Sequence, residues 1–351
     1  MKNFIYLRGL RHAEHTVFCV QDGQKFYYDP QFGSKCAFSS GQQVKRSILD
    51  SILDSLNEQQ APITFNYLID KNALNIKEPW SPCDPTFTDQ LLGGWMKAQT
   101  GSTAVKRRSP FSISALRPLH PLLGGLEYQK ENLTFDRSSN PNIHPVIVKN
   151  SKGEVLTEEQ IVEFLQDNNR TLPRRSWIPD QTRATGLFIY DIAIDLRTLF
   201  SISTNQHEPE LTTEKIEMLK SEGWIENKNV FGSCLTLSKD KRDKIIDAIA
   251  RGLINWRITS NQARTFSLME TLALAVSYNA NSIASSIRAE LSEDDKRKAI
   301  PVLTKMPDAD LYVALTCNGY INDANGTIDA LYSAEAKIKE MLSSYDYENN
   351  N

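Results

Sequence analysis

The sequence lacks an apolar run long enough to cross a membrane. A membrane-spanning helix needs about 20 consecutive, mostly apolar residues, and the 351-residue chain contains no such run. The opening residues Met1-Lys-Asn-Phe-Ile-Tyr6 lead straight into a strand-like pattern, without the small-residue cleavage site of a secretory signal peptide. We therefore expect a cytoplasmic protein that makes no membrane contact.

Cysteine is also scarce, and the motifs of common enzyme classes are missing. The chain has 5 cysteines, an odd number, and none of them forms a CxxC pair, which argues against a disulfide framework or a zinc site. No P-loop, GxSxG, HExxH or usable GxGxxG motif occurs. The cluster Arg11-His-Ala-Glu-His15 lies in a predicted strand, where His12 and His15 point to opposite faces. We expect no cofactor, no metal and no catalytic site.

The charge balance excludes a generally basic nucleic-acid-binding protein. With 40 Lys and Arg against 43 Asp and Glu, the net charge is −3, so any nucleic-acid surface has to be a local cluster. The segment Gln90–Leu126 contains no acidic residue, and a second basic cluster lies beside Trp177. The cations singled out in these two clusters are Lys106, Arg107, Arg108, Arg174 and Arg175. Basic loops suit a nucleic-acid strand, but ordinary solvated loops have the same composition.

The apolar pattern predicts a core of alternating strands and helices. Strands are expected at 4–20, 63–69 and 187–196, helices at 41–57 and 239–256, and a last core strand or buried helix at 266–276. This order is that of the split βαβ, ferredoxin-like or RNA-recognition (RRM) core, an α+β fold. Residues 1–285 are then a palm with an inserted finger region at about 71–185, and residues 286–351 are a C-terminal extension with a disordered tail.

The segment Ser39–Arg46 opens the clearest helix. Ser40 and Gln43 have capping-box spacing, and the helix N-terminus offers unpaired N–H groups to a phosphate. Gln42 shares a face with Lys45 and Arg46, away from the apolar residues. Amide, ammonium and guanidinium groups on one face suit contacts to an RNA backbone. A well-capped helix with an ordinary solvated face gives the same pattern.

Three segments, in order, resemble one family. Ser40-Gly-Gln-Gln-Val-Lys-Arg46 resembles the Ser-x-Gln-x-x-Lys-Arg signature of the CRISPR-associated "Cas seven" backbone subunits, DevR-like branch. Asp89-Gln-Leu-Leu-Gly-Gly-Trp-Met96, followed by Lys106-Arg-Arg-Ser-Pro-Phe-Ser-Ile-Ser114, is similar to the family's Gly-x-Met helix and Ser-Pro strand, with Ile113 in place of Val. Gly186–Leu196 resembles the central strand that ends in Ile-Asp-Leu. The resemblance covers about residues 4–280.

The resemblance implies a specific role. Such subunits polymerise head to tail on a guide RNA (crRNA) in a type I, I-B-like Cascade complex, contact other Cascade subunits, and leave guide bases free to pair with target DNA. A palm, fingers and a thumb hairpin that kinks the guide are expected; residues 200–235 and 145–183 both qualify as the thumb. The resemblance makes Ser40, Gln42, Gln43, Lys45 and Arg46 candidate contacts to the guide backbone. Arg8 and Arg11 of the first strand join the RNA-binding candidates.

Two other readings remain open from the residues. The same fold supports RAMP-type endoribonucleases that process guide RNA or cut target RNA, and this would require an active-site residue such as Asp29, His12 or His15 near the RNA. In the second of these readings, the chain is a stand-alone regulator or interaction module that binds no RNA. The family to which the segments are similar is not a nuclease in type I systems, so we expect a non-catalytic, crRNA-binding subunit for antiviral defence.

Overall fold

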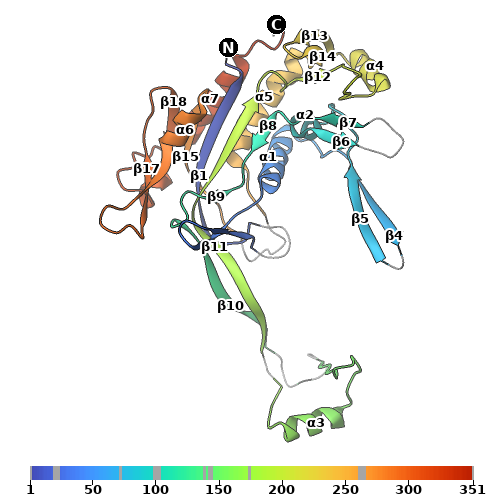
Figure 1. Cartoon of the computed structure of the whole chain (residues 1–351), viewed down its shortest axis with the longest axis vertical. Helices are drawn as coiled ribbons and strands as arrows, with labels where there is room; N and C mark the ends of the chain where they lie inside the picture. The colour runs from blue at the N-terminus through green and yellow to red at the C-terminus, as the bar shows by residue number, and fades with distance from the viewer. Residues whose placement is uncertain are drawn as a thin grey trace. The chain divides into compact units, whose positions relative to one another are not determined.

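The computed structural model describes residues 2–18, 24–70, 73–97, 104–136, 140, 145–172, 175–259 and 266–349. The chain divides into two compact units (Figure 1). The larger unit comprises Met1–Leu126 and Ala184–Asn351, and the smaller unit comprises Glu127–Arg183. The described chain is a mixed α and β protein with mainly antiparallel strand pairs, as the sequence pattern predicts.

The elements, in chain order, have the following bounds. The strands are β1 (Phe4–Thr16), β2 (Phe26–Asp29), β3 (Ser34–Ala37), β4 (Thr64–Asp70), β5 (Ala73–Trp80), β6 (Trp95–Lys97), β7 (Val105–Arg107), β8 (Phe111–Ile113), β9 (Arg117–Pro118), β10 (Gly124–Asp136), β11 (Arg175–Asp195), β12 (Ser201–Ser203), β13 (Ile225–Asn229), β14 (Gly232–Thr236), β15 (Thr271–Ser277), β16 (Ile287–Leu291), β17 (Ala299–Leu303) and β18 (Ala309–Val313). The helices are α1 (Gly41–Leu56), α2 (Thr88–Gly93), α3 (Glu158–Asp167), α4 (Thr213–Ser221), α5 (Lys239–Asn255), α6 (Ala280–Ser286), the 3-10 helix η2 (Leu315–Gly319) and α7 (Ala330–Ser343).

The largest sheet is built around β1. Its strand order is β10-β11-β1-β15-β18, and β8 and β9 also pair with β11. β1 is antiparallel to both β11 and β15, with Leu7 opposite Ile192 and Val276. Successive side chains of a strand point to opposite faces, so β1 contributes Leu7 to one face and Arg8 to the other.

Helices α1 and α5 cover one face of this sheet. Ile48 and Ile52 of α1 and Ile249 of α5 are fully buried in the same apolar cluster as Leu7. The two helices approach closely at Gly252, where an added Cβ would lie 2.4 Å from Cγ1 of Ile52. Glycine is therefore required here by the close helix contact, since any side chain would overlap a neighbour.

The C-terminal residues are built into the same unit as the sheet. β18 pairs with β15. α7 buries Ile338 in the same apolar cluster as residues of α5. Tyr347 is also buried, and its hydroxyl donates a hydrogen bond to the Leu342 carbonyl at 3.0 Å. The C-terminal extension expected from residue 286 thus contributes a strand to the sheet and apolar side chains to the core, and the tail expected to be disordered begins at the buried Tyr347.

The prediction that residues 63–69 form a buried core strand is wrong. β4 pairs only with β5, in a separate two-stranded ribbon, where Tyr67 lies opposite Ile76 and Ile69 opposite Leu74. All four side chains are more than half exposed. A short apolar run does not reveal what covers it. Strands β8, β9 and β10, from the stretch expected to be an insertion, pair with β11 instead.

The smaller unit contains α3. Thr157 caps this helix by accepting a hydrogen bond from the Gln160 backbone, and the Gln160 side chain accepts one from the Thr157 backbone in return. No residue of α3 is buried. Among the described helices of the whole chain, none is long and apolar enough to cross a membrane.

Candidate nucleic-acid interface

The N-terminus of α1 is held by Ser40. The Ser40 hydroxyl accepts a hydrogen bond from the Gln43 backbone N–H at 3.3 Å, as expected of an N-cap. The Gln43 amide donates to the Ser47 hydroxyl at 3.5 Å instead of reaching back to the cap, so only half of the expected capping box forms. Gln42 is exposed at the first turn. Its amide is free to meet a ligand at this end of the helix.

Residues 114–117, between β8 and β9, lie directly beside this cap. Ser39 and Leu116 exchange two backbone hydrogen bonds, of 3.0 and 3.1 Å. At Gly41 an added Cβ would lie 2.7 Å from the Ile113 carbonyl oxygen. The glycine is therefore needed for the approach of β8, and the segment that follows β8 is fixed against the start of α1.

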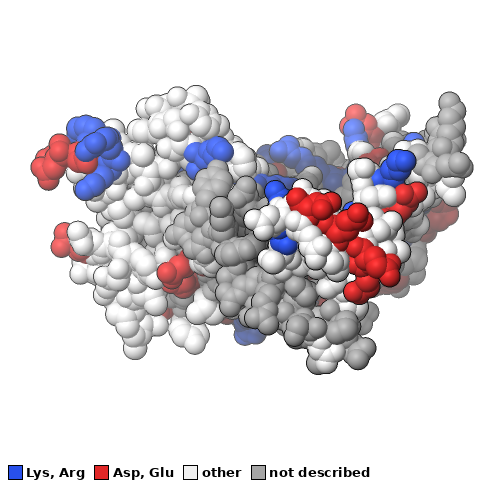
Figure 2. Space-filling view, turned by 90° about the horizontal axis from the view of Figure 1, so that it is seen from below, with Lys and Arg blue, Asp and Glu red and all other residues white. Residues whose placement is uncertain are grey.

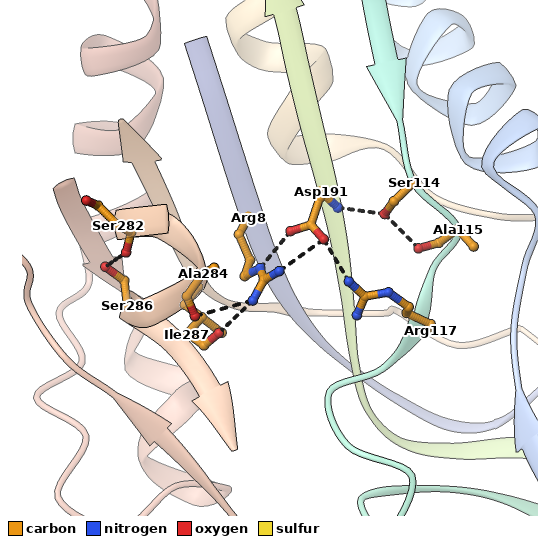
Figure 3. Close-up of polar contacts among 9 residues, drawn as sticks. All are labelled: Arg8, Ser114, Ala115, Arg117, Asp191, Ser282, Ala284, Ser286 and Ile287. Atoms are coloured by element: carbon orange, nitrogen blue, oxygen red, sulfur yellow. Dashed lines mark hydrogen bonds and ion pairs between the residues drawn. The ribbon is translucent and has the colours of Figure 1, made fainter. Parts of the chain in front are cut away.

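A carboxylate with two guanidinium partners occupies the neighbouring sheet surface (Figure 3). Arg8 donates from Nε to Oδ1 of Asp191 at 2.6 Å and from Nη2 to Oδ2 at 3.1 Å. Arg117 donates to the same Oδ2 at 2.9 Å. The Asp191 backbone N–H is bound by the Ser114 hydroxyl at 2.8 Å, which ties the network to the strand beside the helix cap. Two cations on one carboxylate leave one positive charge in excess.

Arg117 is the member of this network that is open to solvent. Its side chain is 37% exposed, against 15% for Arg8. Arg8 also donates to the Ile287 carbonyl at 3.1 Å and the Ala284 carbonyl at 3.4 Å, so its donors are largely engaged. Arg8 therefore orients Asp191, while Arg117 offers the charge to an anionic ligand.

Aromatic side chains of the β2–β3 hairpin add a stacking surface. Phe26, Tyr27 and Tyr28 are all more than a third exposed, and Tyr28 is 62% exposed. Burial of part of Tyr27 and the nearby Cys36 raise the pKa of the Tyr27 hydroxyl to about 12, and Arg117 opposes this rise. Exposed aromatic rings suit the bases of single-stranded RNA.

Lys45 and Arg46 lie on the predicted helix face but are engaged within the chain. Lys45 donates to the Gly93 carbonyl at 2.8 Å, and burial, together with Arg107, lowers the pKa of its ammonium to about 8. Arg46 pairs with Asp50 at 2.6 Å and with Asp89 at 3.6 Å. These two cations join α1 to α2 in the described structure.

Arg11 and Arg107 are buried in the core. Arg11 donates to the carbonyls of Ile254, Trp256 and Met269 and lies over the Trp256 ring at 4.0 Å. Arg107 donates to the carbonyls of Leu91, Thr198 and Ser201. Burial lowers the pKa of each guanidinium to about 10. Neither group is accessible to a ligand, because each satisfies backbone carbonyls that would otherwise lack partners.

The remaining basic candidates separate into two groups. Lys106 and Arg108 are exposed on either side of buried Arg107. Arg174 lies outside the described residues, and only the backbone of Arg175 is described, as the first residue of β11. The accessible cations of the described interface are thus Arg117, Lys106 and Arg108.

His12 and Asp29, two of the residues named for a nuclease, make contacts within the chain. Nδ1 of His12 lies 3.0 Å from Oε1 of Glu270, and its ring stacks on Tyr320 at 4.1 Å. Asp29 accepts hydrogen bonds from the backbones of Gln31 and Phe32, as a turn residue does. Within the described ranges, no cluster of His, Cys, Asp or Glu has the geometry of a metal site.

Charge is distributed in small groups over the surface. On the face drawn in Figure 2, both acidic and basic side chains gather locally, and most of the described surface carries neither. This distribution agrees with the net charge of −3. The described residues on this face form no broad basic surface for a polyanion.

One residue of the interface escaped the sequence reasoning, since Asp191 was read only as part of an apolar strand. Arg117 is one of the cations of the acid-free segment Gln90–Leu126. An aspartate in the middle of the apolar segment Leu187–Leu196 is the signal that points to an ion pair, because a strand interior rarely contains an unpaired charge.

No protein-family model and no curated protein matches the sequence. Among solved structures, the chain is similar to a chain of a "CRISPR RNA-guided surveillance complex, pre-nicking", with 9% identity, a TM-score of 0.45 and coverage of 78% of each chain. It is also similar to a chain of a "CRISPR RNA-guided surveillance complex", with 10% identity, a TM-score of 0.45 and coverage of 97% of this chain and 99% of that one. A likeness at this level defines neither a family nor a function.

Proposed function

We propose that this chain is a non-catalytic subunit that binds a guide RNA along its backbone, in a Cascade-type CRISPR surveillance complex of the DevR-like "Cas seven" kind. The observation that carries the proposal is the cap of α1. Ser40 and exposed Gln42 match the family signature and stand at a helix N-terminus, beside the excess positive charge of Arg117. Backbone N–H groups, an amide and a guanidinium suit phosphates and 2′-hydroxyls.

The arrangement of the strands supports an RRM-like palm. β15, β1 and β11 are neighbours, and β8, β9 and β10 pair with the far side of β11. With α1 after β1 and α5 after β11, the order is that of a split βαβ core. This proposal differs from the sequence expectation in one respect: the second core strand comes from residues 111–136 and not from 63–69.

The contacts proposed for the guide change accordingly. Ser40, Gln42, Gln43 and Arg117 lead the interface, and Lys106 and Arg108 extend it. Lys45 contacts RNA only after it releases the Gly93 carbonyl, and Arg46 only after it releases Asp89. Backbone contacts of this kind leave the base edges of the guide free to pair with target DNA. Copies that stack head to tail through unlike surfaces form an open filament.

The test is co-expression with a CRISPR array, followed by size-exclusion chromatography with absorbance at 260 and 280 nm. We expect a peak larger than one chain with excess absorbance at 260 nm, and extraction of guide-length RNA from it. A matched preparation without the array controls for unspecific RNA. Elution as a nucleic-acid-free chain in both preparations would refute the proposal, and shortened RNA would indicate the nuclease.

A further inference from the structure

A cavity of about 330 Å³ lies in the larger unit. Its lining comes from the start of β1, the segment after β7, the residues around β12 and the turn between β13 and β14. This volume is at the lower end for small-molecule sites. The cavity therefore accommodates a ligand of modest size, such as one nucleotide unit.

One wall of the cavity is a stack of planar groups. The guanidinium of Arg197 lies 4.9 Å from the ring centre of Phe4 and 4.9 Å from that of Phe231, and Phe4 stacks on Tyr6 at 5.9 Å. Phe231 is 59% exposed, so the stack ends in an aromatic surface that is open to solvent. A base has a π-face that can extend such a stack.

The turn that carries Phe231 is fixed by Asn229. The Asn229 side chain accepts a hydrogen bond from the Phe231 backbone N–H at 2.9 Å and donates to the Ser201 hydroxyl at 3.1 Å. It also lies 3.4 Å from the Arg197 carbonyl, to which it donates. The backbone of the turn that presents the ring is thus fixed before any ligand binds, which reduces the entropy lost on binding.

The charges around the cavity favour an anion. Arg197 is bound by Asp195 through two hydrogen bonds, of 2.8 and 2.9 Å, which raise its pKa and neutralise the pair. Glu210 faces buried Arg107 at 3.9 Å. Arg108 is exposed on the cavity wall and has no hydrogen-bond or ion-pair partner among the described residues. With buried Arg107 counted beside Glu210, the charged groups in and behind the cavity wall have one cation in excess, and the guanidinium of Arg108 is the one available to a ligand.

We infer that this cavity binds one nucleotide unit, with the base on the ring of Phe231 and the phosphate on Arg108. The inference rests on the proposed function for the source of the nucleotide, which is then a unit of the bound RNA strand. A free nucleoside monophosphate has the same chemistry, since it joins a base to an anionic phosphate. Separate binding measurements with RNA and with a nucleoside monophosphate distinguish these two sources of the nucleotide.

The test measures fluorescence anisotropy of a single-stranded RNA of about ten nucleotides on the full chain, and calorimetric binding of adenosine monophosphate. Phe231→Ala should weaken binding about tenfold, since stacking of one base has an effect of that order. Phe231→Trp should retain affinity. Arg108→Ala should lower the slope of log affinity against log salt by about one.

Two matched controls isolate the cavity. Phe266→Ala removes an equally exposed phenylalanine, 59%, that does not line it, and Arg297→Ala removes an arginine whose side chain is 91% exposed. Loss of RNA affinity in the cavity variants alone supports the inference with RNA as the source, and loss of monophosphate binding alone supports it with a free nucleotide. Cavity variants that match wild type in both assays overturn it. If the wild-type chain binds the monophosphate but no RNA, the proposed function is refuted, while the inference that the cavity binds a nucleotide is retained.

Discussion

Replacement of Lys45 by methionine should change how stability depends on pH. The Lys45 ammonium is largely removed from water beneath α2, where it donates to Gly93 at 2.8 Å. Burial, followed by Arg107, lowers its pKa from 10.5 to about 8. The unfolded chain therefore binds more protons than the folded chain between pH 8 and 10.5, and the stability contributed by this group rises with pH across that window and is lost as the pH falls through 8.

The size of the effect follows from the two pKa values. The full difference between 10.5 and about 8 corresponds to at most about 3 kcal/mol. Because the side chain keeps partial contact with solvent, screening reduces this figure, and the expected gain is about 1–2 kcal/mol. Lys45→Met removes the titrating group and retains most of the side-chain volume. The gain in stability with rising pH should therefore disappear.

Urea unfolding at several pH values between 7.5 and 9.5 measures the effect, with the two chains compared at each pH so that all other titrations cancel. We expect the wild type to gain stability over Lys45→Met as the pH rises. Parallel stability profiles would refute the reasoning, because they would show that the Lys45 ammonium keeps its ordinary pKa. Gln42→Met, at an exposed position of the same helix turn, is the control for the added methionine.

Three further changes test other parts of the structure. Ser40→Ala should cost about 1 kcal/mol in urea unfolding, because the Gln43 N–H loses its acceptor, while Ser40→Asp should retain the stability. Gly252→Ala should destabilise the chain by about 1–3 kcal/mol despite its better helix propensity, since the new methyl overlaps Ile52; unchanged stability would show that α1 and α5 separate without cost. Arg117→Ala should lower the salt slope of RNA binding by about one for every RNA sequence, and a loss confined to one sequence would argue against a backbone contact.

The sequence predicts the regular core well because periodicity reports which residues are buried. α1 and α5 were expected from apolar residues at helical spacing, and both helices occur with bounds close to those expected. β1 occurs within the expected strand 4–20, and β11 includes nearly all of the strand expected at 187–196. β15 occurs at Thr271–Ser277, largely within the range 266–276 that was read as either a strand or a buried helix. These elements bury one continuous apolar face, and the spacing of that face is a local property of the chain.

Partners distant in sequence were not predictable in the same way. The apolar residues of β4 read as a buried strand, yet they lie exposed in a ribbon with β5. Arg11 and Arg107 read as surface cations, but each satisfies carbonyls far along the chain. Residue type alone does not state whether a guanidinium meets a phosphate or a carbonyl. Burial decides between the two, and burial depends on the tertiary fold.

The central claim is that the chain holds RNA by its backbone and does not cut it. The most direct measurement is binding of two end-labelled RNAs of unrelated sequence to the purified chain over a series of salt concentrations, with the recovered RNA then resolved on a denaturing gel. The account predicts equal affinities for the two RNAs, the same linear decrease of log affinity with log salt, and intact RNA. Absence of binding at low salt, or fragments that appear with magnesium, would contradict it.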